Sequence, residues 1–215
     1  MSLSDLAYRA MVTACALTHP TERATHRFGP APFLPRLFAD RFTHLGGISR
    51  DEFRTQLEGC RSFEDANWTG YWEAFADRHL AAADAALGEL GGPGTSDLLG
   101  DGTVDVCALG QLLAPAVEIL SERGAAADPA ACERFCAENP AHANAAIALD
   151  GVIKAMTYEF VAAWPGWSPR RLRAYERSHV LGEIVLTALA PAMGVSIERV
   201  EIPFGDGDRV RGYLM

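Results

Sequence analysis

The chain has 215 residues, of which 49% are hydrophobic and 22% charged, the proportions of an ordinary globular protein. A formal net charge of −9 argues against nucleic-acid binding, which requires a basic surface. The sequence has neither a signal peptide nor an apolar run that could span a bilayer, and its five cysteines form no even disulfide framework. We therefore expect a cytoplasmic protein that binds neither nucleic acid nor membranes.

The first 60 residues predict short helices joined by an irregular arm. A helix is expected over residues 4–17, and four prolines between residues 19 and 35 then indicate an arm without regular structure. The segments RLFADRF and SRDEFRTQLEGC predict two more short helices. Ser49 is the expected N-terminal cap of the second, with acidic residues in its first turn.

The strongest helical pattern covers about residues 63–90, where Ser62 and Asp65 resemble a capping box. One stripe of this helix holds residues at three-, four- or seven-residue steps, namely Trp68, Trp72, Phe75, His79, Ala86 and Leu90. The aromatic members, together with Tyr71, are either ordinary core or the wall of an apolar pocket. On the second interpretation Trp68, Trp72 and Phe75 contact a substrate.

The middle of the chain predicts one helix over residues 104–124 that Pro115 kinks, and a short one between Pro129 and Pro140. Cys132 and Cys136 lie one helical turn apart in the short helix, with His142 nearby. Two thiolates and an imidazole could hold zinc, but no fourth ligand is evident and the C-x-x-C spacing is missing. Structural cysteines are therefore the favoured interpretation, and no metal site is expected.

Two long helices follow. Residues 142–164 place Leu149, Val152, Met156, Phe160 and Ala163 on one face. The last helix begins with a serine cap at position 168 and a proline at its first position. Its apolar stripe predicts packing against another helix and consists of Leu172, Tyr175, His179, Gly182, Leu186, Leu189 and Met193.

Residues 200–215 alternate apolar and polar side chains on either side of a G-D-G-D turn, which predicts a β-hairpin. Val200, Ile202 and Phe204 share one face of the first strand, and Val210 and Leu214 share one face of the second. An isolated hairpin is marginally stable in water. We therefore expect its apolar face to be covered by the chain's own helices, by a second copy or by another chain. The predicted fold is mainly α, a helical bundle with a C-terminal two-stranded antiparallel β-hairpin.

The sequence contains no complete catalytic motif. It has no G-x-S-x-G, no dinucleotide-binding glycine pattern after a strand and no phosphate-binding loop, so we expect no cofactor. Glu159, Tyr158, His79 and His179, in that order, are the candidates for acid–base or hydrogen-bonding roles. The plainer interpretation is a surface carboxylate, a half-buried phenol and two histidines packed in the core.

The C-terminal segment SPRRLRAYERSHVLGEIVLTALAPAMGVSIERVEIPFGDGDRVRGYLM resembles a junction in α/β-hydrolases of the 2,6-dihydropseudooxynicotine hydrolase type. In those proteins a helical lid precedes a helix of D-P-x-x-x-x-A-Y-x-R-S character and two strands, roughly E-R-V-E-I-P-[YF] and L-x-G-Y-L. These elements correspond here to residues 168–169, 174–178, 198–204 and 210–214. The segment RSFEDANWTGYWEAFADRHLAAADAAL is similar to the family's lid, with Trp68 and Trp72 at its two tryptophan positions, and IKAMTYEFVAAW resembles the lid helix that follows.

The resemblance covers about residues 33–90 and 145–215 and implies three parts. Residues 1–32 form an N-terminal helix and proline-rich arm, and residues 33–194 a helical lid-like domain in which 91–144 is an insertion. Residues 195–215 form the hairpin that resembles the first strands of an α/β-hydrolase sheet. In that family the catalytic serine, acid and histidine follow the hairpin, so the catalytic domain is absent from this chain.

Three hypotheses follow. The leading one is the lid of an α/β-hydrolase-like enzyme that acts on an apolar or aromatic carbonyl compound, contacts it through Trp68, Trp72, Phe75 and Tyr158, and docks on a catalytic-domain partner chain. The second is a stand-alone helical enzyme that drives cyclisation, rearrangement or elimination by positioning and acid–base chemistry. The third is a non-catalytic ligand-binding bundle that forms a homodimer through the hairpin.

Overall fold

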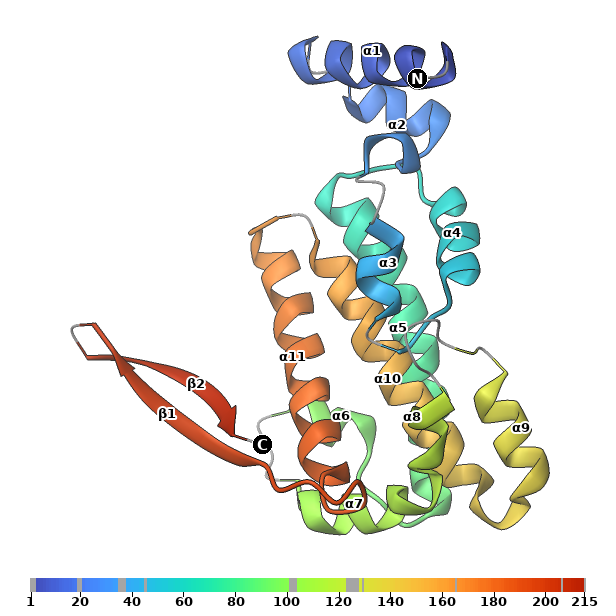
Figure 1. Ribbon diagram of the computed structural model, residues 1–215, viewed down its shortest axis with the longest axis vertical. Coiled ribbons are helices and arrows are strands. Elements are labelled where there is room, and N and C mark those ends of the chain that lie inside the picture. The colour runs from blue at the N-terminus through green and yellow to red at the C-terminus, as the bar shows by residue number, and fades with distance from the viewer. Residues whose placement is uncertain are drawn as a thin grey trace.

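The computed structural model describes residues 3–18, 21–34, 38–44, 46–100, 104–122, 128, 130–164, 166–205 and 207–214. It confirms a mainly α protein with a C-terminal β element (Figure 1). The α-helices are α1 (Leu3–Thr18), α2 (Thr21–Phe28), α3 (Phe38–Thr43), α4 (Arg50–Gly59), α5 (Asp65–Glu89), α6 (Thr95–Leu99), α7 (Val106–Leu113), α8 (Glu118–Glu122), α9 (Ala131–Glu138), α10 (Ala143–Ala163) and α11 (Pro169–Leu189). Short 3₁₀ turns are η1 (Ala31–Phe33), η2 (Ala114–Ala116) and η3 (Pro140–His142), and the strands are β1 (Glu198–Phe204) and β2 (Asp208–Leu214).

Helix α10 is the centre of the bundle and packs along both α5 and α11. Its contact with α5 is close because Gly151 has no side chain, and a Cβ there would lie 2.7 Å from the carbonyl oxygen of His79. Two side chains of α5 also donate hydrogen bonds to backbone carbonyls near the end of α10. Trp68 Nε1 lies 3.0 Å from the oxygen of Val161, and Thr69 Oγ1 lies 3.3 Å from that of Ala162.

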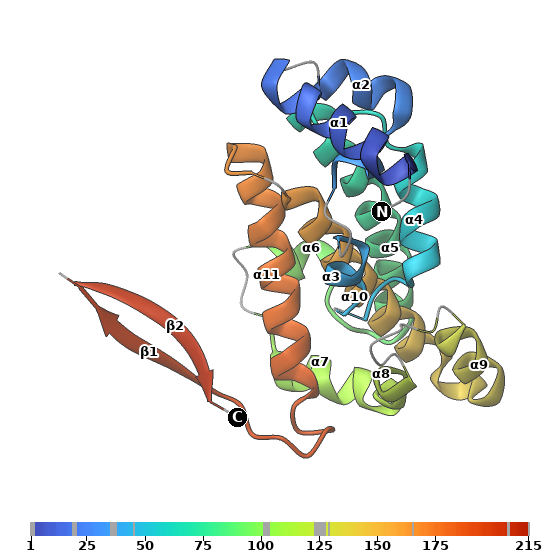
Figure 2. The same ribbon diagram turned by 45° about the horizontal axis from the view of Figure 1, so that its top comes forward.

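The N-terminal helices lie at one end of the bundle (Figures 1 and 2). The irregular arm predicted from residue 19 onward is wrong in part, because α2 forms within it over Thr21–Phe28. No proline falls between residues 21 and 29, so the chain has room for two turns of helix there. The predicted cap of α4 is confirmed, since Ser49 Oγ accepts a hydrogen bond from the backbone N–H of Glu52 at 3.1 Å.

The structure differs from the predicted helices in one boundary, one division and one additional helix. Helix α5 begins at Asp65 rather than residue 63, and Ser62 is not its cap, because its hydroxyl accepts from the N–H of Glu64 and donates to Glu22. The helix predicted over residues 104–124 divides at Pro115 into α7, η2 and α8, because proline lacks the N–H that a continuous helix needs. Helix α6 was not predicted, since its five residues are too short to show a period.

The apolar stripe of α11 was expected to pack against another helix, and this prediction is wrong for most of its members. Leu172, Tyr175, Leu186 and Met193 are 37%, 47%, 38% and 53% exposed. The inward face of α11 instead carries Ala174, Ser178, Leu181 and Ala188, which are buried.

Two arginines orient α11 in this way. Arg171 Nε lies 2.7 Å from Asp65 of α5, and Arg177 Nε lies 2.6 Å from Glu159 of α10. Because these ion pairs face the other two long helices, they fix the rotation of α11 about its axis and leave the apolar stripe on the outside. The cap prediction for this helix is confirmed, since Ser168 Oγ accepts from the N–H of Arg171 at 3.3 Å.

Strands β1 and β2 form an antiparallel two-stranded sheet that projects from the α11 side of the bundle (Figures 1 and 2). Ile202 pairs with Val210 and Val200 with Gly212, so the predicted apolar residues of both strands lie on one face. On the opposite face Arg209 Nη1 lies 3.0 Å from Glu201. The chain's own described helices do not cover the apolar face, where Ile202, Phe204, Val210 and Leu214 are all exposed.

Candidate functional site

The structure brings most of the predicted site residues into one aromatic cluster between α5 and α10. The ring of Tyr158 lies 6.2 Å from Trp72, 5.2 Å from Phe75 and 5.5 Å from His79, measured between ring centroids, and it stacks on all three. Trp68 joins the cluster through Trp72, at 5.7 Å. The four residues of α5 lie on one stripe, as the spacing predicted, and the tyrosine faces them from α10.

This cluster is densely packed rather than hollow. Trp68, Trp72 and Tyr158 are fully buried, while Phe75 and His79 are half-buried. Four of the pockets on the described surface have volumes of about 620, 510, 470 and 390 Å³, and none of these four is lined by the five residues of the cluster. The packing favours the core interpretation of the aromatic residues, and their contact with a substrate stays a prediction.

The phenol of Tyr158 is held by α4. Its oxygen accepts a hydrogen bond from Gln56 Nε2 at 2.5 Å and donates one to Glu52 Oε1 at 3.1 Å. Burial raises the pKa of Tyr158 far above its ordinary value of 10, and the neighbouring Glu52 carboxylate raises it further. The phenol therefore stays protonated at physiological pH and can act only as a neutral hydrogen-bonding group.

Glu159 points away from the aromatic cluster, to the junction of α5, α10 and α11. It is fully buried beside Arg177, which also reaches Asp77 of α5 at 3.3 Å. Burial raises the pKa of Glu159 from 4.5 to about 7, Arg177 opposes the rise, and Glu73 and Asp77 add to it. A buried carboxyl that titrates near neutral pH has the proton affinity of a general acid or base. None of the four pockets is lined by it, however.

His179 lies apart from the other acid–base candidates. Its side chain is exposed on the outer face of α11, with the ring centroid 6.3 Å from Tyr175 and Nδ1 3.9 Å from Glu183. The expectation of a packed core histidine is therefore wrong at this position, because the stripe that carries it faces outward. The four acid–base candidates thus occupy three separate places and form no single constellation.

The largest of the four pockets, about 620 Å³, lies where α10 ends and α11 begins, and sequence reasoning missed it. Aromatic and apolar side chains form its walls, namely Phe160, Trp164, Trp167, Leu172 and Tyr175. Arg171, only 4% exposed, also lines it. The pattern W-P-G-W, which places two tryptophans around a helix-breaking turn, is the feature of the sequence that could have indicated it.

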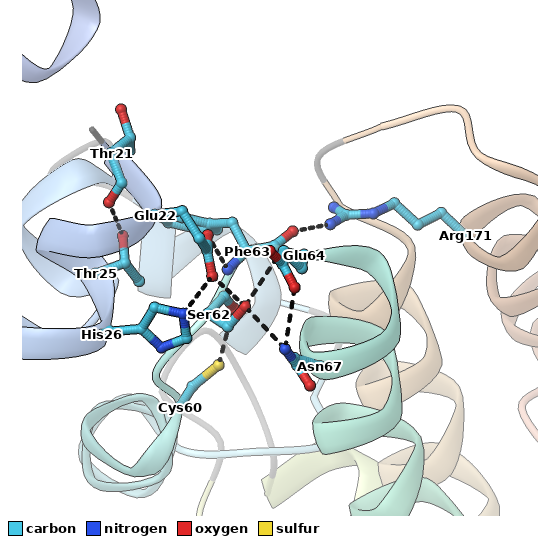
Figure 3. Close-up of polar contacts among 10 residues, drawn as sticks. All are labelled: Thr21, Glu22, Thr25, His26, Cys60, Ser62, Phe63, Glu64, Asn67 and Arg171. Carbon is cyan, nitrogen blue, oxygen red and sulfur yellow. Dashed lines mark hydrogen bonds and ion pairs between the residues drawn. The ribbon is translucent and has the colours of Figure 1, made fainter. Parts of the chain in front are cut away.

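A second polar cluster joins α2 to the start of α5 (Figure 3). Glu22 accepts hydrogen bonds from the Ser62 hydroxyl and, at 3.0 Å, from the backbone N–H of Phe63, and His26 Nε2 lies 3.4 Å from the same carboxylate. The Ser62 hydroxyl donates to the carboxylate rather than to the His26 imidazole, so the described residues do not form the Ser–His pair that activates a serine nucleophile in a catalytic triad. Burial raises the pKa of the adjacent Cys60 thiol, which makes it unreactive.

The possible zinc ligands do not converge on one point. Cys132 Sγ and Cys136 Sγ lie 4.0 Å apart, and Cys136 Sγ contacts the carbonyl oxygen of Ala143 at 3.7 Å. Throughout the described part of the chain, no group of three or more His, Cys, Asp or Glu side chains is placed to hold a metal ion. The same residues contain no helix with the length and apolar character needed to cross a membrane.

Comparison of the chain with family models, with curated proteins and with solved structures returned no match. The α/β-hydrolase resemblance thus rests on the sequence motifs alone.

Proposed function

We propose that residues 1–215 form the helical lid and first hairpin of an α/β-hydrolase-like enzyme that acts on an apolar or aromatic carbonyl compound. The observation that carries the proposal is the hairpin, a two-stranded sheet with one apolar face that the described residues leave uncovered. Such a hairpin is marginal alone and acquires stability when further strands or helices cover it. A catalytic sheet that continues from it would supply that cover.

The two strands differ as edges for a further strand. β1 contains Pro203, which has no N–H to donate, whereas β2 contains no proline. A full ladder of hydrogen bonds can therefore extend from β2, and β1 suits the outer edge of a sheet. The hairpin projects from the side of the bundle where α11 lies (Figures 1 and 2), and α11 itself carries exposed apolar side chains, so one partner domain could contact both elements.

In this role the chain has no hydrolytic activity of its own, because the nucleophile, acid and histidine belong to the catalytic domain. The test is to assay the chain with p-nitrophenyl esters and to label it with a fluorophosphonate. We expect no turnover and no labelling. Ester turnover by the chain that the fluorophosphonate abolishes would contradict the proposal.

The coding DNA downstream of codon 215 gives a second test. We expect a reading frame that contains G-x-S-x-G and a late histidine. The domain that it encodes should copurify with the chain, and Val210→Ser on the apolar face of β2 should weaken this association. Arg209→Ser, the neighbouring position on the charged face, is the matched control and should leave the association intact. Equal effects of the two substitutions would refute docking through the apolar face.

A second candidate function is supported by the same uncovered face, which two copies of the chain could bury against each other to form a homodimer. Light scattering after size-exclusion chromatography separates the two candidates. A dimer that Val210→Ser dissociates, and Arg209→Ser does not, favours the homodimer. A chain that remains monomeric at high protein concentration would refute the homodimer.

A further inference from the structure

We propose that the 620 Å³ pocket between α10 and α11 binds a planar aromatic ring that carries a carbonyl oxygen, with the ring against Trp167 and the oxygen toward Arg171. The inference rests on the proposed function, because it identifies where the lid holds its substrate. It moves the substrate site from the buried cluster around Tyr158 to the outer face of the bundle.

The shape and lining of the pocket suit an aromatic ligand. Its volume falls within the range of about 300–1,000 Å³ typical of small-molecule sites. Two of the aromatic rings that line it pack against aromatic rings of α3. The Trp164 ring centroid lies 4.4 Å from that of Phe38, and the Phe160 ring centroid lies 5.6 Å from that of Phe42. Rings held in this way offer fixed surfaces on which a second ring can stack.

Trp167 completes the pocket from the turn between the two helices. It is 87% exposed, the largest exposed fraction among the large hydrophobic residues of the described chain. A tryptophan so exposed beside a concave apolar surface is typical of a binding site rather than of a core. A planar ligand between Trp167 and the opposite wall would remove the indole from water.

Arg171 supplies the polar contact. Its Nε donates to Asp65 at 2.7 Å and its Nη2 to the carbonyl oxygen of Phe63 at 2.6 Å. Nη1 is buried and has no hydrogen-bond partner among the described residues. A buried donor without an acceptor is unfavourable, and a ligand oxygen at the base of the pocket would satisfy it.

The surroundings of Arg171 favour a neutral carbonyl over a carboxylate. Hydrogen bonds from Ser168 and Arg171 lower the pKa of Asp65, which therefore stays ionised and neutralises the guanidinium. Gly166 lies next to the side chain of Arg171, and a Cβ at this position would be 3.2 Å from Arg171 Cδ. The absence of a side chain at this position keeps the approach to the guanidinium open.

The test is calorimetric titration of the full chain with acetylnaphthalene, ethylnaphthalene and naphthoate. We expect acetylnaphthalene to bind at one site per chain. Ethylnaphthalene, which has nearly the same shape but no oxygen, should bind about tenfold more weakly, since it leaves the charged donor unpaired. Equal affinity of these two compounds would refute the role of Arg171. Tighter binding of naphthoate than of acetylnaphthalene would contradict the preference for a neutral carbonyl and would show that the pocket binds an anion.

Two matched substitutions locate the site. Leu172→Trp should fill the pocket and reduce acetylnaphthalene affinity at least tenfold. Leu186→Trp is the control, because Leu186 lies on the same helix with nearly the same exposure, 38% against 37%, but outside this pocket. Trp167→Ala removes a stacking surface and should weaken binding about fivefold. Equal loss of binding in the two leucine variants would overturn the assignment, as would the absence of binding by the unmodified chain.

These outcomes are independent of the docking tests. Specific binding of acetylnaphthalene by a chain for which no catalytic domain exists would support the proposed ligand site and refute the proposed lid function. A catalytic domain that docks on the hairpin of a chain with no affinity for acetylnaphthalene would do the reverse.

Discussion

The α5–α10 contact and the β1–β2 hairpin both present apolar side chains on one face, but these side chains are buried in the first region and exposed in the second. In the helical contact, Trp68, Trp72 and Tyr158 are fully buried, and their polar atoms find partners across the interface or on α4, apart from the indole N–H of Trp72. In the hairpin, Ile202 and Phe204 stand in water. The apolar side chains of the helical contact are buried by the chain itself, whereas the apolar face of the hairpin is not covered by any described part of the chain.

An amphipathic pattern therefore predicts that one face of an element is covered, but it does not say what covers that face. Helix α11 shows both outcomes in one element. Its inward face is tied to α5 and α10 by Arg171 and Arg177, and its outward face carries the exposed Leu172 and Leu186. We expect substitutions in the closed contact to affect folding, and substitutions on the open faces to affect binding.

The sharpest test of this comparison is the same substitution at two tryptophans. Trp72→Ala creates a cavity in the aromatic cluster and should reduce the free energy of unfolding by about 3–5 kcal/mol. Trp167→Ala removes an exposed ring and should change it by less than about 0.5 kcal/mol. Urea denaturation followed by far-UV circular dichroism measures both. Similar losses in the two variants would mean that Trp167 is covered in solution.

The next largest effect is a pH dependence from Glu159. Its pKa is about 7 in the folded protein against 4.5 when unperturbed, so the folded state holds a proton that the unfolded state releases between these values. Stability is therefore greatest below about pH 4.5 and falls by about 3 kcal/mol as the pH rises to 7, as far as this group contributes. Glu159→Gln should remove this contribution and make the protein more stable than wild type at pH 8.

The measurement is the midpoint of thermal unfolding from pH 5 to pH 8 for both proteins. The advantage of Glu159→Gln should shrink as the pH is lowered, because the wild-type carboxyl then becomes protonated. A variant that is less stable than wild type by the same amount at every pH would show that the ion pair with Arg177 outweighs the cost of burial.

A smaller loss is expected at the start of α11. Ser168→Ala removes the oxygen that caps the N–H of Arg171 and should cost about 1 kcal/mol. Ser196→Ala, an exposed serine outside any helix or strand, is the control and should be neutral. Chemical denaturation of the two variants side by side measures the difference. No difference between them would mean that the cap contributes nothing beyond the packing of α11.

The smallest effect on folding should come from the hairpin. Deleting residues 198–215 from the isolated chain should leave the midpoint of thermal unfolding unchanged, because the described helices do not cover the apolar face of the hairpin. Amide exchange over residues 198–214 should be fast for the same reason. A lower midpoint after deletion, or slow exchange in the intact chain, would show that the hairpin is covered in solution.

Much of the fold could be predicted from local patterns. Periodicity located the long helices and the hairpin, and Ser49 and Ser168 were identified as caps because capping depends on residues only a few positions apart. Pro115 was placed correctly as an interruption, but the division into three short elements was not foreseen. The candidate site was predicted less well. The aromatic stripe of α5 was found, but the pocket around Trp167 was missed because its walls come from two helices and the turn between them.

Which segments become helices or strands, and which side chains share a face, can be inferred from the sequence because both follow from repeats of 3.6 and 2 residues along the chain. Which of those faces are covered depends instead on contacts between elements that lie far apart in the sequence. The pairing of Arg171 with Asp65 spans 106 residues and that of Arg177 with Asp77 spans 100, and these distant contacts turn the apolar stripe of α11 outward. No local pattern encodes such a rotation, because it depends on where another helix places its carboxylates.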